Sequence, residues 1–143
     1  MSRQMILDQT IVPASFDLDP ETGSALPLDR WLETRAENKA AIEAGVLLEG
    51  DERIDALEPF VEELAFVALH LPKFTDGRIY SHARRLRELW KYKGVILVHG
   101  DVLRDQLLYM SRSGINGFYM REDQDLQASI AAFGLYTEHY QYN

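Results

Sequence analysis

Short apolar runs alternate with helix-like segments between residues 45 and 133, and this alternation constrains the fold more than any other feature of the chain. The two longest runs are LAFVALHL at 64–71 and GVILVHG at 94–100. Runs that are apolar almost without interruption are typical of strands covered on both faces. Two shorter runs of the same kind are GVLLEG at 45–50 and INGFYM at 115–120. Alternation on this scale predicts βα units that form a parallel sheet.

Helical periodicity flanks these strand candidates, and capping residues mark several helix ends. Pro59 places the start of one helix near Glu58. We expect Asp101 to be the N-cap of a later helix, and Gly45 and Gly114 each to end one. The expected helices cover 29–44, a stretch from 58 onwards, 81–90, the segment from 101 to Gly114, and 123–133.

These patterns predict an α/β fold in which about four βα units form a small parallel sheet, open or half-barrel-like, with helices on its faces. We expect a single α/β domain over 1–143, with its βα core at 45–133. An irregular N-terminal arm, 1–28, precedes the core and contains two short strand candidates, MIL and TIV.

An aromatic tail, 135–143, follows the core. Tyr136, Tyr140 and Tyr142 supply the amphipathic area that is common at interface hot spots, so one prediction is that they anchor a partner. The alternative is that the tail completes the chain's own sheet edge or covers its core.

The composition excludes several kinds of chemistry. The 143 residues include no cysteine, so disulfides, thiolate nucleophiles and Cys-ligated metal centres are ruled out. The four histidines lack metal-ligand spacing, and no phosphate-binding loop, dinucleotide fingerprint or nucleophile elbow occurs. We therefore assign no catalytic residue, no metal and no cofactor. No run approaches the ~18 apolar residues of a membrane helix, so we expect a cytoplasmic protein with no membrane contact.

Positive charge is concentrated in one segment of an acidic chain. The formal net charge is −8, yet residues 70–104 hold eight of the fifteen lysines and arginines and a net charge of +5. An acidic chain argues against nucleic-acid binding, which depends on phosphate neutralisation. A local basic patch suits a small anion or an acidic surface on a partner protein.

Candidate binding residues follow the two longest strand candidates. Ligands of parallel α/β proteins gather at the carboxyl ends of the strands, and two polar loops occupy such positions. If the two strands are neighbours, both loops share one rim, where a helix N-terminus also favours an anion. The candidate anion- or partner-binding residues are Lys73, Asp76, Arg78, Ser81, Arg84, Arg85, His99, Asp101 and Arg104.

Structural alternatives exist for most of these residues. Asp76 and Gly77 form a good turn dipeptide, and Asp101 is a good helix cap. The arginines at 84, 85 and 87 radiate around a helix, so at least one faces solvent or a partner. His99 is either a general acid or base or a strand-end histidine satisfied by backbone. Lys73 and Arg78 flank a tight turn, which makes this pair the strongest candidate for an anion or partner contact.

The motifs PKFTDGR-x-YS-x-AR-x-LR and GDVLRDQL give a resemblance to a known family. Over roughly residues 46–120 the chain resembles a bacterial family, domain of unknown function 934. Members are described in connection with sulfite reduction, because their genes lie beside those of sulfite reductase. The resemblance places Lys73, Phe74, Asp76, Gly77, Arg78, Ser81, Arg84 and Arg87 in the first motif, and Gly100, Asp101, Asp105 and Gln106 in the second.

Two positions depart from the family pattern. Leu97 stands where members often have arginine, so if that arginine holds an anion in relatives, the anion hypothesis loses one partner in this chain. Ser113 stands where members often have cysteine, so thiol chemistry is excluded here.

Two functions of different classes follow. The first is an accessory protein of assimilatory sulfite reduction, within cysteine biosynthesis, that is a partner of the sulfite reductase hemoprotein component or its electron donor. The resemblance implies this role, and self-association remains open beside it. The second is a small oxyanion-binding α/β enzyme, an oxidoreductase linked to sulfite reduction, or a binding protein for sulfite or a phosphorylated metabolite.

Overall fold

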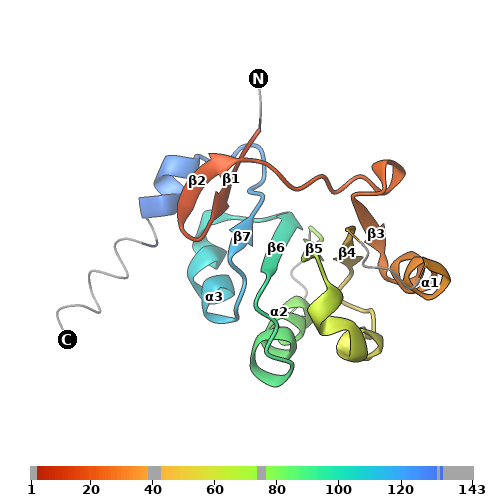
Figure 1. Cartoon of the computed structure of the whole chain (residues 1–143). Coiled ribbons are helices and arrows are strands. Elements are labelled where there is room, and N and C mark those ends of the chain that lie inside the picture. Colours follow the sequence, from red (N-terminus) through yellow and green to blue (C-terminus); the bar gives the residue numbers. More distant parts are fainter. Residues whose placement is uncertain (1–2, 39–42, 74–76, 132, 134–143) are drawn as a thin grey trace.

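One seven-stranded sheet organises the chain, in the order β2-β1-β7-β6-β5-β4-β3 (Figure 1). This computed structural model describes residues 3–38, 43–73, 77–131 and 133. The predicted tail residues Tyr136, Tyr140 and Tyr142, and the predicted turn residue Asp76, lie outside the described residues.

Five strands of the sheet are parallel and follow one another in chain order. They are β3 (Ala25–Pro27), β4 (Gly45–Leu48), β5 (Phe66–Leu71), β6 (Val95–Gly100) and β7 (Gly117–Phe118). A hairpin of β1 (Gln4–Leu7) and β2 (Thr10–Pro13) extends the sheet, with β1 antiparallel to both β2 and β7. The predicted α/β class is confirmed. The count of about four βα units is approximate, because the sequence did not predict β3.

The helices that connect the parallel strands lie on one side of the sheet (Figure 1). Crossovers between neighbouring parallel strands are right-handed, so strands in chain order carry all their helices on the same face. The sheet is open, with β2 and β3 as its two edge strands. The connecting helices are α1 (Leu28–Asn38), η2 (Ile54–Glu63), α2 (Arg78–Arg84), η3 (Arg85–Leu89), η4 (Arg104–Gln106) and α3 (Leu107–Arg112).

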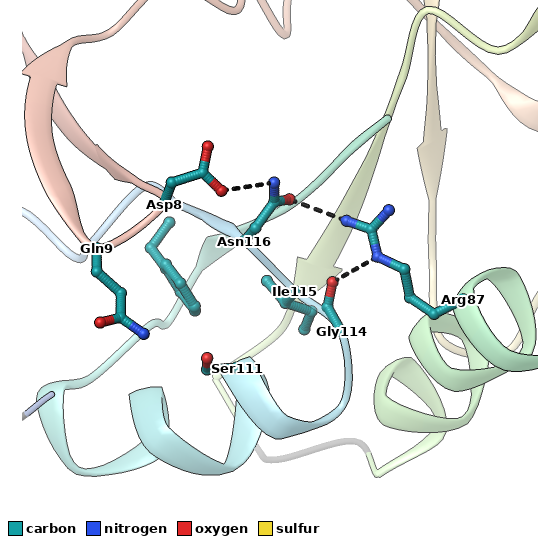
Figure 2. A pocket seen from close by; sticks show the side chains of 8 residues that line it. Asp8, Gln9, Arg87, Ser111, Gly114, Ile115 and Asn116 are labelled. Carbon is teal, nitrogen blue, oxygen red and sulfur yellow. Dashed lines mark hydrogen bonds between the residues drawn. The ribbon is translucent and has the colours of Figure 1, made fainter. Parts of the chain in front are cut away.

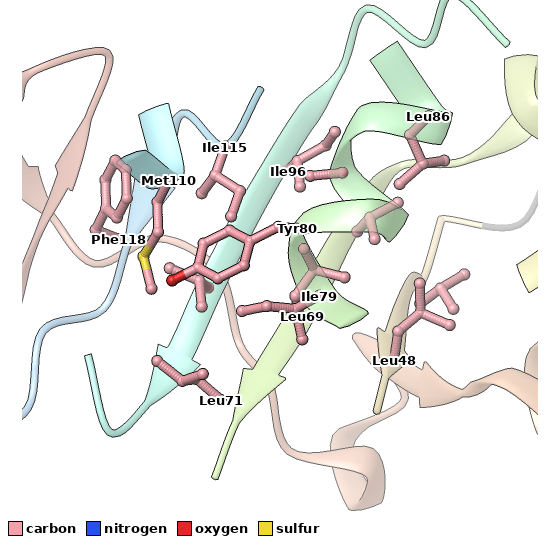
Figure 3. Close-up of a cluster of buried hydrophobic side chains, with 14 of the residues drawn as sticks. Leu48, Leu69, Leu71, Ile79, Tyr80, Leu86, Ile96, Met110, Ile115 and Phe118 are labelled. Atoms are coloured by element: carbon pink, nitrogen blue, oxygen red, sulfur yellow. The ribbon is translucent and has the colours of Figure 1, made fainter. Parts of the chain in front are cut away.

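Alternation along the strands divides the core into two clusters. Leu69 of β5 belongs to the larger cluster, which fills the helix-covered face (Figure 3). Ala68, its neighbour in the chain, belongs to a smaller cluster on the opposite face. Phe16 packs edge-on against Phe66 there, with ring centroids 4.9 Å apart. We call this second face the arm-covered face, because residues 14–18 of the N-terminal arm lie over it.

Gly45 does not end a helix, which corrects the sequence prediction. It is the first residue of β4 and pairs with Ala25 of β3. A Cβ atom added at this position would lie 2.4 Å from Cζ of Phe66. Glycine is therefore required by the close approach of an aromatic ring rather than by a helix cap.

The helix predicted from Asp101 begins later in the chain. The backbone remains non-helical until η4 starts at Arg104, and Gly100 adopts a φ of +107° that turns the chain out of β6. Gly114, with a φ of +109°, follows α3 as predicted. Within the described residues no helix is both long and apolar enough to cross a membrane.

Candidate functional site

A row of polar side chains crosses the arm-covered face where the parallel strands end. His70 of β5 lies directly opposite His99 of β6 in the strand register. Glu49 comes immediately after β4, and Tyr119 immediately after β7. Alternation directs all four side chains to the same face as the small apolar cluster, since Leu47, Ala68, Leu97 and Tyr119 belong to that cluster. The row therefore occupies the edge where parallel α/β proteins bind their ligands.

Glu49 orients the imidazole of His70. Its two carboxylate oxygens lie 3.0 and 2.9 Å from Nδ1 of His70. A carboxylate at Nδ1 keeps the proton on that nitrogen and leaves Nε2 as the free end of the ring. Both side chains are substantially exposed, so this pair is accessible to solvent.

His99 is the unusual member of the row. Its Nε2 is buried and has no hydrogen-bond partner among the described residues. Burial, together with the positive charges of His70 and Arg3, lowers the pKa of His99 to about 4. His99 is therefore a neutral imidazole at pH 7. The sequence analysis offered the alternative that backbone groups satisfy the His99 ring. Its Nε2 has no such backbone partner among the described residues.

A hollow of about 650 Å³ adjoins His99 on the arm-covered face. Arg3 reaches it from the start of the chain, where its Nη2 donates to the carbonyl oxygen of Met120 and its guanidinium lies over the ring of Tyr119. Tyr119 in turn donates to the carbonyl oxygen of Phe16 at 2.6 Å, which fastens the arm to the sheet. The lining residues are Arg3, Leu18, His99, Gly100, Arg121, Glu122 and Asp123.

Asp101 is held by an arginine at this hollow and is not a helix cap. It accepts a hydrogen bond from Nη1 of Arg121 at 3.0 Å, while Nε and Nη2 of Arg121 bind both carboxylate oxygens of Asp123. The structural alternative that the sequence offered for Asp101 is therefore wrong, because the chain is not yet helical at this point.

A second candidate surface lies on the outer side of α2 and η3. Ser81, Arg84, Arg85, Glu88 and Leu89 line a groove of about 350 Å³. Leu89 is 66% exposed. Arg84 joins this groove to α3, because its Nη2 donates to the hydroxyl of Tyr109 at 3.1 Å and its guanidinium lies over the Tyr109 ring. We call this surface, with Tyr109, the α2–α3 face.

The structure does not bring the predicted rim residues together on one surface. β5 and β6 are neighbours as expected, so Lys73 and Arg104 follow adjacent strand ends, and both side chains are exposed. Arg78, also exposed, is the first residue of α2. Arg84 and Arg85, however, lie on the helix-covered side, whereas His99 lies on the arm-covered side. Arg85 is also paired with Asp55.

Arg87, which the sequence grouped with these arginines, is a structural clamp (Figure 2). Its guanidinium donates to the carbonyl oxygen of Gly114 at 2.9 Å, and to those of Tyr92 and Gly94 at 2.8 and 2.7 Å. It also donates to Oδ1 of Asn116 at 3.1 Å, and Asn116 donates to Asp8. This network connects η3, the start of β6, the start of β7 and the β1–β2 turn. Arg87 therefore stabilises the fold.

The sequence did not predict Arg3, Glu49, His70 or Tyr119 as site residues. The positions of Glu49 and His70 could have been predicted from the sequence. Each lies at the end of an apolar run, and the alternation along the strand places its side chain on the same face of the sheet as that of His99. Arg3 carried no such signal, since its contact with Met120 spans 117 residues of sequence. In the part of the chain that the structure describes, no cluster of three or more His, Asp or Glu side chains could hold a metal ion.

Comparison with known protein families gives a match over residues 45–143. A family model described as "Bacterial protein of unknown function (DUF934)" matches residues 45–143, which include β4 to β7 and the helices between them. No curated protein and no solved structure matches the chain.

Proposed function

This chain belongs to the DUF934 family, and we propose that it is an accessory protein of assimilatory sulfite reduction. In this role it binds sulfite reductase in the cytoplasm, through the hemoprotein component or the electron donor, and aids assembly or electron delivery for cysteine biosynthesis. The link to sulfite reduction comes from the resemblance carried by the two motifs, whose family is described in that connection.

The α2–α3 face is the observation that supports a binding role. Leu89 and Tyr109, at 66% and 49% exposure, are the two exposed large apolar side chains among the described residues. Arg84 contacts Tyr109 and lines the same groove as Leu89. Aromatic and arginine side chains are enriched at interface hot spots, and an exposed leucine beside them gains free energy when a partner removes it from water.

Charge indicates what kind of surface would bind there. Residues 70–104, which supply α2 and η3 of this face but not Tyr109, have a net charge of +5, while the rest of the chain carries −13. Lys73, Arg78 and Arg84 are exposed cations of that segment. Arg84, on the groove itself, would attract an acidic partner surface, whereas the overall negative charge disfavours nucleic acid.

Binding of the purified chain to purified sulfite reductase components tests the proposal. The hemoprotein component and its electron donor are immobilised separately, and the dissociation constant is measured for the unmodified chain and for Leu89→Asp. We expect Leu89→Asp to weaken binding at least about tenfold, the effect of losing a hot-spot contact. Ala36→Asp is the matched control, because it places the same charge at an exposed position of α1.

Two outcomes would contradict the proposal. The first is no binding to either component at micromolar concentrations. The second is equal binding by Leu89→Asp and Ala36→Asp, which would mean that the α2–α3 face does not contact the partner. The alternative function, an oxyanion-binding protein, stays a prediction that this experiment does not address.

A further inference from the structure

The hollow on the arm-covered face has the features of a small-ligand site, and it lies on the opposite side of the sheet from the α2–α3 face. It adjoins the carboxyl ends of β6 and β7, where crevices of open parallel sheets bind ligands. Its lining combines one apolar residue, Leu18, with several polar side chains. This mixture is typical of sites where a few polar groups orient a ligand.

The buried Nε2 of His99 is a polar atom for which the fold provides no partner. Buried polar groups are nearly always hydrogen-bonded, and an unsatisfied one reduces stability. His99 itself lies in register with His70, and the chain leaves the strand only at the next residue, Gly100. Because this atom is closed off from solvent, a rotation of the His99 ring toward the hollow would have to accompany binding, and a ligand atom would then supply the missing hydrogen bond.

The charged groups that act directly on the ring of His99 are positive. The groups that act on its ring are His70 of β5 and Arg3, which precedes β1, and both oppose a positive charge there. The nearby carboxylates are already neutralised in part: Asp101 and Asp123 by Arg121, and Glu49 by His70. Glu122 also lines the hollow, and Asp17 of the arm acts on the adjacent Tyr119.

Arg3 supplies the cation that a negatively charged ligand needs. Only its Nη2 is engaged in a hydrogen bond within the described chain, to Met120. The stacking of the guanidinium over Tyr119, 5.1 Å from the ring centroid, holds it in place. The remaining N–H groups of Arg3 are in a planar arrangement suited to two oxygens of one anion.

We propose that this hollow binds a small oxyanion, held by the guanidinium of Arg3 and by the imidazole of His99. The class comprises sulfite, sulfate and phosphate, which share the oxygen acceptors that the site recognises. The inference is independent of the accessory role, since the two rest on opposite faces of the sheet. Binding also favours protonation of His99, so the affinity for sulfate, which keeps both its charges in this range, should rise as the pH falls toward the pKa that His99 has in the bound state.

The experiment titrates the purified full chain with sodium phosphate, sulfate and sulfite, and follows the His99 ring signals by NMR. The His99 resonance is assigned from the spectrum of His99→Gln. Sodium chloride at matched ionic strength is the control for general salt effects. We expect saturable shifts at His99 with the oxyanions and none with chloride, and a raised pKa for His99 when the site is saturated.

Two arginine variants separate the site from surface charge. Arg3→Gln should weaken oxyanion binding about tenfold or more, whereas Arg30→Gln, a matched loss of an exposed arginine on α1, should change it less than twofold. Tighter binding of sulfite, sulfate or phosphate than of the other two would identify which oxyanion the hollow recognises. The proposal is overturned if none of the anions shifts His99 beyond the chloride control, or if both arginine variants have the same effect.

Discussion

The imidazole rings of His70 and His99 lie 5.2 Å apart, centroid to centroid, in neighbouring parallel strands. Two imidazolium ions at this distance repel each other, and His99 is the more buried of the two. Burial and the charges of His70 and Arg3 lower the pKa of His99 to about 4, so His99 is the member of the pair that stays neutral. The arrangement has consequences for both stability and binding.

Acid sensitivity should be traceable to His99. The unfolded chain takes up a proton at His99 near pH 6.5, whereas the folded chain does so only near pH 4. Between these values the unfolded state binds more protons, so the free energy of unfolding falls as the pH falls from about 6.5 to about 4. This effect amounts to about 3 kcal/mol at most. Urea unfolding of the unmodified chain and His99→Gln across this range measures it.

The two pH profiles should differ in slope between pH 6.5 and pH 4 and run parallel above pH 7. Other groups that titrate in the same range are common to both chains, so the difference isolates His99. Identical slopes would show that His99 is protonated as easily in the folded chain as in the unfolded one.

Removing the Arg87 clamp should destabilise the fold strongly. Arg87→Ala leaves the carbonyl oxygens of Gly114, Tyr92 and Gly94 without their donor, and we expect the free energy of unfolding to fall by about 3 kcal/mol or more. Arg85→Ala is the neighbouring control, because it breaks only an exposed ion pair with Asp55 and should cost at most about 1 kcal/mol. Denaturant titration compares the two, and equal losses would contradict the structural role of Arg87.

The close approach of Phe66 to Gly45 predicts a glycine-specific effect. Gly45→Ala places a Cβ atom 2.4 Å from Cζ of Phe66, so the ring must shift at a cost of about 1–3 kcal/mol. Gly77→Ala is the control, because a Cβ atom there meets nothing within 4 Å and the backbone φ is −64°. Thermal unfolding should show a lower Tm for the first variant alone. An unchanged Tm for Gly45→Ala would mean that the β4–β5 packing differs from the one described.

Arg78 should matter for function more than for stability. It is exposed at the first position of α2, so we expect Arg78→Ala to leave the Tm nearly unchanged. Because Arg78 is a candidate anion- or partner-binding residue, we expect the same variant to slow growth on sulfate or sulfite as sole sulfur source. Arg78→Lys should restore growth only in part, because lysine cannot reproduce bidentate contacts. Arg30→Ala serves as the control for loss of a surface charge. A large fall in Tm for Arg78→Ala would instead assign this arginine to the fold.

The sequence predicted the middle strands and the β1–β2 hairpin at one edge of the sheet, but it missed β3 at the other edge. Continuous apolar runs identified β4 to β6, because both faces of these strands are covered. β3 is three residues long and ends at Pro27, so it offers no run long enough to detect. Gly45 was misassigned because a glycine after a helical pattern is usually a cap, and the packing of Phe66 against it is a tertiary contact.

The candidate site was predictable only where position along a strand was sufficient. His99 was singled out because it follows a buried run, and its place at the carboxyl end of β6 agrees with that argument. The contacts of Arg3 with Met120 and Tyr119 depend on the β1–β7 pairing, which no local pattern indicates. The lysines and arginines that cluster in the sequence at residues 70–104 do not form one surface in the fold, because they lie on different sides of the sheet.

Growth of a bacterium that lacks this chain tests the accessory role in sulfite reduction most directly. We expect slow growth when sulfate or sulfite is the sole sulfur source, and normal growth on sulfide or cysteine, which enter the pathway after the reduction step. Expression of the unmodified chain should restore growth on sulfite, and expression of Leu89→Asp should not, although it should fold and accumulate as the unmodified chain does. Equal growth on sulfite with and without the chain, or a growth defect that sulfide does not relieve, would contradict the account.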